Sequence, residues 1–341
     1  MIDVIIPVYK AEKTLPKTLA SIMEQSILDK LKIYLVIDGD ENAIYDYIAA
    51  NFNVIFDNKI CIIKSHMNEG PGYCRQLGIE NSDSDYFTFI DADDTYAGAY
   101  SLELLSKVAK ENPNASCIVG NFAEEQPGLK FFTHPNDSVW VFGKLYRRSF
   151  IEKYNIRFNS TRANEDTGFN TKVKLLADKD NPILSVQDIV YYWHYREDSI
   201  TRKNNCEYSY GESFVGYVDN MIDAIKFAKS TAPSNGYIEK FAIQTMVNLY
   251  IYWLQTDKRD SKFSYRNFSY CAKYYKEIFS DVMDKLRNTD NGSNILKSEF
   301  AKEYHSRANE LMDICPGITF FEFLENLSDF NDEEKKEEEV D

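Results

Sequence analysis

The residues with the clearest chemical potential are three closely spaced carboxylates, Asp91, Asp93 and Asp94, which follow an apolar run at Asp85–Ile90. Three carboxylates in one loop repel one another unless a cation lies between them. A hard divalent cation such as Mg²⁺ or Mn²⁺ relieves that repulsion and can take carboxylate and diphosphate oxygens together. The loop therefore indicates a metal site, although Asp94 could instead cap the next helix.

A second acidic turn, Asp38-Gly39-Asp40, also ends an apolar run. A carboxylate at Asp38 can accept the imide N–H of a uracil or the hydroxyls of a ribose. The alternative is an ordinary turn, because Asp-Gly is a common turn dipeptide. Further along, the glycine-containing loop Asn68–Arg75 leads into a predicted helix, and its Arg75 carries a fork that suits phosphate.

Alternating strands and helices position these groups. The apolar spacing predicts strands at Asp3–Val8, Lys32–Ile37, Val54–Phe56, Lys59–Lys64 and Asp85–Ile90, and helices at Thr14–Gln25, around Ile44 to Ile48, and at Gly72–Ile79. This alternation predicts a mostly parallel α/β sheet flanked by helices. Ligands of such sheets bind beyond the carboxyl ends of the strands, which is where both acidic turns lie.

The remainder of the chain is mixed and then helical. We expect strands at Ser116–Asn121, Ser138–Phe142 and Val186–Tyr195, and helices at Lys144–Tyr154, Asp166–Leu176, Val218–Ala228, Ile238–Leu254 and Tyr265–Leu286. These elements predict an α/β domain over residues 1–205 and a helical C-terminal domain over residues 206–330, for acceptor binding or oligomerisation. The acidic run at residues 331–341 is too polar to pack and is expected to be disordered.

Composition limits the partners. The formal net charge of −15 disfavours binding to nucleic acid or to anionic membranes. No apolar run approaches the ~20 residues that span a bilayer, and the N-terminus has no basic region or cleavage site of a signal peptide. Six scattered cysteines without a CxxC pair indicate reduced thiols. We therefore expect a cytoplasmic protein without an integral membrane segment, and leave a homo-oligomer open.

Seven short motifs, in order, resemble the family 2 glycosyltransferases, which use nucleotide sugars and have the GT-A fold. They are Val4–Tyr9, Val36–Asp40, Asn68–Gly70, Phe89–Asp94, Trp140–Arg148, Asn164–Asp166 and Tyr192–Thr201. The resemblance covers about residues 1–205. It implies a Rossmann-like, mostly parallel mixed sheet. The sequence departs from the family at Cys74-Arg75-Gln76, where the family often has Ala-Arg-Asn.

The resemblance also implies roles for individual residues. Asp166, beside Glu165, would be the general base. Asp93 and Asp91, with His194, would ligate a divalent metal, Mn²⁺ or Mg²⁺. Trp140 and Lys144 would shape the acceptor site. The donor nucleotide sugar would be bound by Pro7, Tyr9, Asp38, Asn68, Gly70, Arg75, Asp91, Ala92, Ser199 and Arg202, with Tyr9 stacked on the base.

The implied reaction is an inverting transfer of a hexose or N-acetylhexosamine, with UDP favoured as carrier, to an acceptor hydroxyl of a glycan. A modified nucleobase or a protein remains open as acceptor. A nucleotidyltransferase and a non-catalytic nucleotide-sugar-binding protein are the competing functions, whereas no GxGxxG follows the first strand to bind NAD. Purely structural roles also remain open for these residues. Asn164 could cap a helix that begins with the acidic pair, His194 could be a packed core residue, and Trp140 and Lys144 could only support the fold.

Overall fold

The computed structural model describes residues 1–39, 46–48, 59–128, 130–161, 163–197, 207–233, 235–287 and 318–330. Its contacts divide the chain into two units, Met1–Arg202 and Lys203–Asp341, and we describe each by itself. The predicted strand Val54–Phe56, most of the helix predicted around Ile44 and the predicted acidic tail lie outside the described residues. The domain boundary predicted at residue 205 also falls there and stays a prediction.

The first unit is built on a mixed sheet with the strand order β3-β2-β1-β4-β8-β6-β9-β5 and with β7 paired to β6. The first four along the chain are β1 (Ile2–Val8), β2 (Leu31–Ile37), β3 (Ile60–Lys64) and β4 (Tyr86–Phe89), which pair in parallel. Their nearly continuous apolar runs are typical of parallel strands covered on both faces. The predicted fold class and these four predicted strands are confirmed.

The other strands complete the mixed part of the sheet. They are β5 (Thr95–Tyr96), β6 (Cys117–Gln126), β7 (Lys130–His134), β8 (Lys144–Arg147) and β9 (Ile183–Trp193). The strand β8 runs antiparallel to both β4 and β6, whereas β9 runs parallel to β6. The sheet is therefore mostly parallel at one end and mixed at the other.

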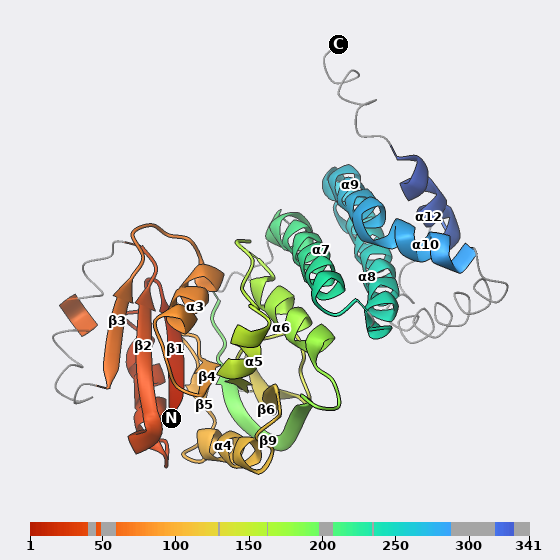
Figure 1. Ribbon diagram of the computed structural model, residues 1–341. Coiled ribbons are helices and arrows are strands. Elements are labelled where there is room, and N and C mark those ends of the chain that lie inside the picture. Colours follow the sequence, from red (N-terminus) through yellow and green to blue (C-terminus); the bar gives the residue numbers. More distant parts are fainter. Residues whose placement is uncertain are drawn as a thin grey trace. The chain divides into compact units, whose positions relative to one another are not determined.

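Helices cover this sheet (Figure 1). They are α1 (Leu15–Met23), α3 (Pro71–Glu80), α4 (Ser101–Glu111), α5 (Arg148–Lys153) and α6 (Glu165–Leu176). Helix α3 lies against β1 and β2, and α4 lies against β6 and β9. Gly78 permits the close approach of α3 to β1, because a Cβ there would lie 2.4 Å from Ile5 Cγ2.

Two elements predicted in the middle of the chain differ from the structure. Ser138–Phe142 is irregular rather than a strand, and only Phe142 forms an isolated bridge, with Phe89. The Asp137 carboxylate accepts the backbone N–H groups of Val139 and Trp140 and so competes with a ladder. The predicted helix at Lys144–Tyr154 begins only at Arg148. Its first four residues form β8, since they fill the place between β4 and β6 and gain ladder hydrogen bonds from both.

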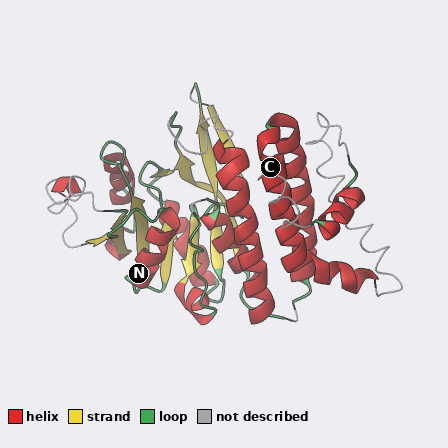
Figure 2. Ribbon diagram, turned by 90° about the horizontal axis from the view of Figure 1, so that it is seen from above, coloured by secondary structure: helices red, strands yellow, loops and turns green. Residues whose placement is uncertain are grey.

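The second unit is helical in its described residues (Figure 2). It contains α7 (Ser213–Thr231), α8 (Tyr237–Arg259), α9 (Ser264–Tyr274), α10 (Ser280–Arg287), α12 (Phe320–Asp329) and π-helices at Glu207–Glu212 and Tyr275–Phe279. Aromatic rings pack in its core: the ring centroid of Phe323 lies 5.1 Å from the ring centroids of both Tyr250 and Trp253. The predicted helical C-terminal region is confirmed. Among the described helices of the chain, none is long and apolar enough to span a bilayer.

Candidate active site

The predicted ligand-binding residues gather at one edge of the first unit. The register pairs Val8 with Ile37 and Ile5 with Phe89, so the parallel strands β1, β2 and β4 end side by side. The residues that follow these strands, including Tyr9, Asp38 and Asp91, therefore share that edge. Asp40, Ser199 and Arg202 lie outside the described residues, so the donor-binding roles of Ser199 and Arg202 remain predictions.

At the ends of β1 and β2, one aromatic ring is exposed and one carboxylate is fixed. Tyr9 is 47% exposed, whereas Pro7 before it is half-buried. Asp38 is buried, and its two oxygens accept the backbone N–H groups of Glu69 at 2.8 Å and Gly70 at 3.0 Å. Asp38 thus holds the loop that carries the exposed Asn68. Binding of a base by these residues stays a prediction.

Arg75 is the centre of the buried part of the site. Its side chain is nearly covered; Nη1 donates to Glu165 Oε1 at 2.9 Å and Nη2 donates to Asp91 Oδ1 at 2.7 Å. The two carboxylates hold the pKa of Arg75 above its ordinary value. The Arg75 side chain thus links α6 to the acidic loop. Its contact with the donor stays a prediction.

The adjacent acids Glu165 and Asp166 have different environments in the first turn of α6. Glu165 is held by Arg75, and Gly72 makes room for it, because a Cβ on Gly72 would lie 2.6 Å from Glu165 Cγ. Asp166 is buried, and its Oδ1 accepts the backbone N–H of Thr167 at 2.7 Å. Its Oδ2 has no hydrogen-bond partner among the described residues.

The environment of Asp166 raises the pKa of its carboxyl group. Burial, and then the neighbouring Glu165 carboxylate, raise the pKa of Asp166 to about 7, while the Arg75 guanidinium opposes the rise. A general base is most effective when its pKa lies near the operating pH. The two adjacent acids therefore differ: Glu165 is paired with Arg75, whereas Asp166 has the raised pKa. The catalytic roles expected for both stay predictions.

Asn164, which precedes this pair, adopts a left-handed conformation with φ of 59° and makes no side-chain capping hydrogen bond. Asn164 does occupy the N-cap position of a helix that begins with the acidic pair, as the structural interpretation expects, but its side chain does not cap that helix. Among non-glycine residues, Asn is one of those that adopt this region most readily, as Asn136 and Asn155 also do. The left-handed turn sets the point at which the acidic pair enters α6.

The acidic loop after β4 contains one structural and one accessible carboxylate. Asp94 is buried and accepts the Tyr191 hydroxyl at 2.7 Å and the His194 backbone N–H at 2.8 Å. Burial raises the pKa of Asp94 well above its ordinary range. Asp94 thus ties the loop to β9 and does not cap a helix. Asp93 is partly exposed and forms an ion pair with Arg196 at 2.8 Å.

Asp93 and Asp91 are the two carboxylates of this loop that could hold a divalent metal. Burial, and then the nearby Asp91, raise the pKa of Asp93, while the Arg196 guanidinium opposes the rise. No group of three or more His, Cys, Asp or Glu side chains in the described residues forms a ready metal site. Mg²⁺ is often held by one or two carboxylates plus substrate phosphates, and Asp93 with Asp91 suits that pattern.

His194 does not join this donor set in the structure. Its Nε2 lies 2.8 Å from Thr95 Oγ1 and its Nδ1 lies 2.9 Å from Glu125 Oε2. The His194 ring thus bridges β5 and β6 from the end of β9. Its role as a metal ligand stays a prediction. Ala92, predicted to bind the donor, is buried in the core, so only its backbone could contact a ligand.

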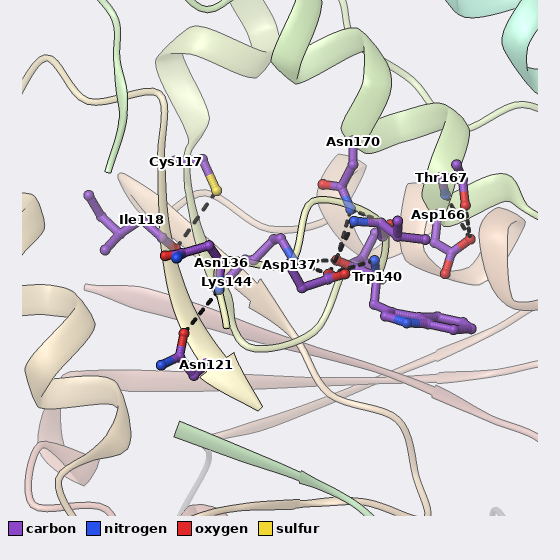
Figure 3. Close-up of polar contacts among 12 residues, drawn as sticks. Cys117, Ile118, Asn121, Asn136, Asp137, Trp140, Lys144, Asp166, Thr167 and Asn170 are labelled. Atoms are coloured by element: carbon purple, nitrogen blue, oxygen red, sulfur yellow. Dashed lines mark hydrogen bonds and ion pairs between the residues drawn. The ribbon is translucent and has the colours of Figure 1, made fainter. Parts of the chain in front are cut away.

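The predicted acceptor residues lie in and after the turn before β8 (Figure 3). Trp140 is partly exposed, and its ring packs on Phe142 and Trp193 at 5.8 and 5.0 Å. Lys144 is only 3% exposed, and its Nζ bonds to Asp137 Oδ2 at 2.9 Å and to the Trp140 carbonyl at 2.5 Å. Lys144 thus supports the backbone of Trp140, and contact of either residue with an acceptor stays a prediction.

Three residues of the site were not predicted from the sequence: Asp137, Asn170 and Arg196. For two of them the sequence does contain an indication of their place in the site. Asn170 follows Asp166 by one helical turn, so it lies on the same face of α6. Arg196 stands inside the motif that contains His194. Asp137 carried no signal beyond its position in a polar turn.

Comparison with known proteins agrees with the geometry. Residues 3–164 match the model of the family described as "Glycosyl transferase family 2". The chain is 28% identical over 229 residues to the glycosyltransferase GlyA of Streptococcus pneumoniae, covering 59% of this chain and 31% of that protein. It is 28% identical over 240 residues to the poly(ribitol-phosphate) beta-glucosyltransferase of Bacillus spizizenii, covering 66% and 37%. The chain thus spans about a third of the length of these relatives.

Solved structures show the same fold. Staphylococcus aureus TarS 1–349 in complex with UDP-GlcNAc matches with a TM-score of 0.63 and 16% identity, over 89% of this chain and 88% of that one. The mannosyltransferase PcManGT from Pyrobaculum calidifontis, in complex with GDP-Man and Mn²⁺, matches with a TM-score of 0.53 and 12% identity, over 90% and 86%. Motif order, fold and family model agree: residues 3–164, within the first unit, match glycosyl transferase family 2.

Proposed function

We propose that the protein is an inverting glycosyltransferase that moves a hexose or N-acetylhexosamine from a UDP-sugar to an acceptor hydroxyl. The proposal rests on the different environments of two adjacent acids in α6: Glu165 is held by Arg75, whereas the buried Asp166 has its pKa raised to about 7. A carboxylate in this state can accept the proton of a hydroxyl near neutral pH. The likeness to a TarS complex with UDP-GlcNAc supports a UDP-sugar as donor.

The donor would lie across the carboxyl edge of β1, β2 and β4. Tyr9 is exposed enough to stack on the base, and Asp38 and Asp91 would bind the base edge and the ribose. Asp93, with Asp91, would hold a divalent metal against the diphosphate. When bound, such a metal supplies Lewis-acid stabilisation of the negative charge that develops on the leaving group.

The proposed transfer needs one base. The acceptor oxygen forms a bond to the anomeric carbon of the sugar while its proton passes to an oxygen of Asp166. The bond between the anomeric carbon and the diphosphate breaks, and its electron pair leaves with the diphosphate. Attack from the face opposite the leaving group inverts the anomeric centre. Glu165 is paired with Arg75, so its carboxylate is directed to the guanidinium rather than to the acceptor.

We propose a glycan or a polyol-phosphate polymer as the acceptor. One relative is named for glucosylation of poly(ribitol phosphate), and another is a teichoic acid poly(glycerol phosphate) polymerase, with 22% identity over 271 residues. Both names describe bacterial polymers with many free or phosphate-linked hydroxyls. The second unit, which is helical where it is described, is a candidate for contacts with such a polymer.

The test is a transfer assay with a panel of UDP-sugars, Mn²⁺, and oligomeric glycan or polyol-phosphate acceptors. Mass spectrometry would detect the added sugar, and the proton coupling at its anomeric carbon would report inversion. Asp166→Asn should bind UDP like the wild type and transfer nothing. If UDP binds but no sugar is transferred from any donor, the chain would instead be a nucleotide-sugar-binding protein.

A further inference from the structure

The turn Asp137–Trp140 is fixed by a buried charge pair (Figure 3). Asp137 Oδ2 accepts the backbone N–H groups of Val139 at 3.1 Å and Trp140 at 2.9 Å, and it also accepts Lys144 Nζ at 2.9 Å. The same Nζ reaches the Trp140 carbonyl at 2.5 Å. Because the two side chains of the pair are only 3% and 13% exposed, water competes little for these bonds.

Asn170 ties the same turn to α6. Its Nδ2 donates to the carbonyl oxygens of Val139 at 2.7 Å and Trp140 at 2.8 Å, and its Oδ1 accepts the Tyr146 hydroxyl at 2.7 Å. Asn170 is buried and lies four residues after Asp166, on the same face of the helix. One amide therefore connects the backbone of Trp140 to the helix that carries the proposed base.

Beside the exposed Ser138, the turn presents two apolar side chains, Val139 and Trp140. Asp137 and Lys144 form an ion pair, and the carbonyl groups of Val139 and Trp140 accept hydrogen bonds from Asn170. Val139 is 40% exposed, and the Trp140 ring is partly exposed with Phe142 stacked behind it at an interplanar angle of 10°. An indole combines an apolar face with an N–H donor at its edge, which suits the C–H face and hydroxyls of a sugar or polyol. Lys144, the cation of this turn, is not free to bind a phosphate.

We propose that Asn170 and Lys144 are positioning residues that hold Trp140 as an acceptor platform in fixed register with Asp166. The platform takes a neutral, hydroxyl-bearing ring or chain, and any phosphate of the acceptor lies elsewhere. This inference rests on the proposed function, because a platform beside a base has meaning only for a transfer to a hydroxyl. Asn170 touches no reacting atom; it acts through the backbone of Trp140.

The test uses Asn170→Leu, which is similar in shape and removes both donors to the turn. Tyr146→Phe is the matched control, since it removes the hydrogen bonds of the Tyr146 hydroxyl to Asn170 and to the Val141 carbonyl but keeps both Asn170 donors to the turn. Both proteins, and Asn170→Ala as a second variant in case the leucine disturbs folding, would be labelled with 5-fluorotryptophan. The chain has three tryptophans, and Trp140→Phe identifies the Trp140 resonance by its disappearance.

We expect Asn170→Leu to shift or broaden the Trp140 fluorine resonance and to raise the acceptor KM about tenfold, as the loss of two hydrogen bonds implies. The UDP Kd should stay within about twofold, because the donor edge is untouched. Tyr146→Phe should change neither the resonance nor the acceptor KM. An unchanged Trp140 resonance in folded Asn170→Leu, or an unchanged acceptor KM with a shifted resonance, would overturn the proposal.

The fluorine measurement also separates this inference from the proposed function. If the wild type transfers no sugar, the function fails, whereas a Trp140 resonance that moves on titration with a neutral disaccharide or ribitol still supports the platform. If those ligands leave the resonance in place while inorganic phosphate moves it, the neutral platform is refuted. No shift with any of them refutes it equally.

Discussion

Asp166→Asn should stabilise the fold at pH 8 while it abolishes transfer. The pKa of Asp166 in the folded protein is raised from 3.8 to about 7, chiefly by burial. A difference of about 3 pKa units corresponds to about 4 kcal/mol of free energy of unfolding, which the wild type loses when this carboxyl ionises. Asparagine has nearly the same shape and cannot ionise, so the variant should keep that stability.

The sign fixes the pH window. Because the folded pKa lies above the unfolded value, the stability contributed by the bound proton is complete below pH 3.8 and is lost as the pH rises through about 7. The two proteins should therefore unfold at similar urea concentrations near pH 4. The variant should gain progressively up to pH 7 and then show a constant advantage.

Urea unfolding followed by near-ultraviolet circular dichroism at pH 4, 6 and 8 measures this difference. Asp188→Asn is the control, because Asp188 is an exposed carboxylate of β9 whose neutralisation should change the free energy of unfolding little. Two results would contradict a buried carboxylate of raised pKa at the start of α6. One is a variant that is less stable than the wild type at pH 8, and the other is a difference in free energy of unfolding that does not depend on pH.

Three further changes test the neighbouring contacts. Glu165→Gln keeps an oxygen for Arg75 but removes the negative charge that, after burial, raises the pKa of Asp166. The acidic limb of the pH profile of kcat/KM should therefore move down by about one pH unit from about 7. If the limb does not move, it belongs to another group. Gly72→Ala places a Cβ 2.6 Å from Glu165 Cγ, so it should lower the free energy of unfolding by about 1–3 kcal/mol in urea titrations, whereas Gly98→Ala, which meets no atom within 4 Å, should not. Tyr9→Ala should weaken UDP binding about tenfold in calorimetry while Tyr9→Phe keeps it, because stacking on a base contributes about 1–3 kcal/mol; equal loss in both variants would point to the hydroxyl.

The parallel half of the sheet was predictable because its signal is local. In β1 and β2 nearly every residue is apolar, and only a strand buried on both faces uses such short, continuous runs. The rule that ligands meet the carboxyl ends of parallel strands then brings Asp38 and Asp91 to one edge without any knowledge of side chains. In contrast, Leu145 and Tyr146 fit a helix and a strand equally well, and the places beside β4 and β6 decided between them.

Side-chain partners in the site were not predictable, because they come from distant parts of the chain. Glu165, which holds Arg75, lies 90 residues away from it. His194 and Lys144 have residue types that suit a metal and an anion, but Glu125 and Asp137 engage them from other elements. A motif indicates which residue types recur at a site, whereas burial and pairing decide which atoms are left for a ligand.

Calorimetric titration of the wild type with UDP, GDP and CDP, each with Mn²⁺ and with EDTA, measures whether the carboxyl edge of β1, β2 and β4 binds a nucleotide. We expect UDP to bind in the presence of Mn²⁺, EDTA to weaken this binding strongly, and GDP and CDP to bind poorly. Binding of UDP that is indifferent to EDTA would contradict the metal role of Asp93. Failure of all three nucleotides to bind would contradict the assignment of the carboxyl edge of β1, β2 and β4 as a nucleotide-sugar site.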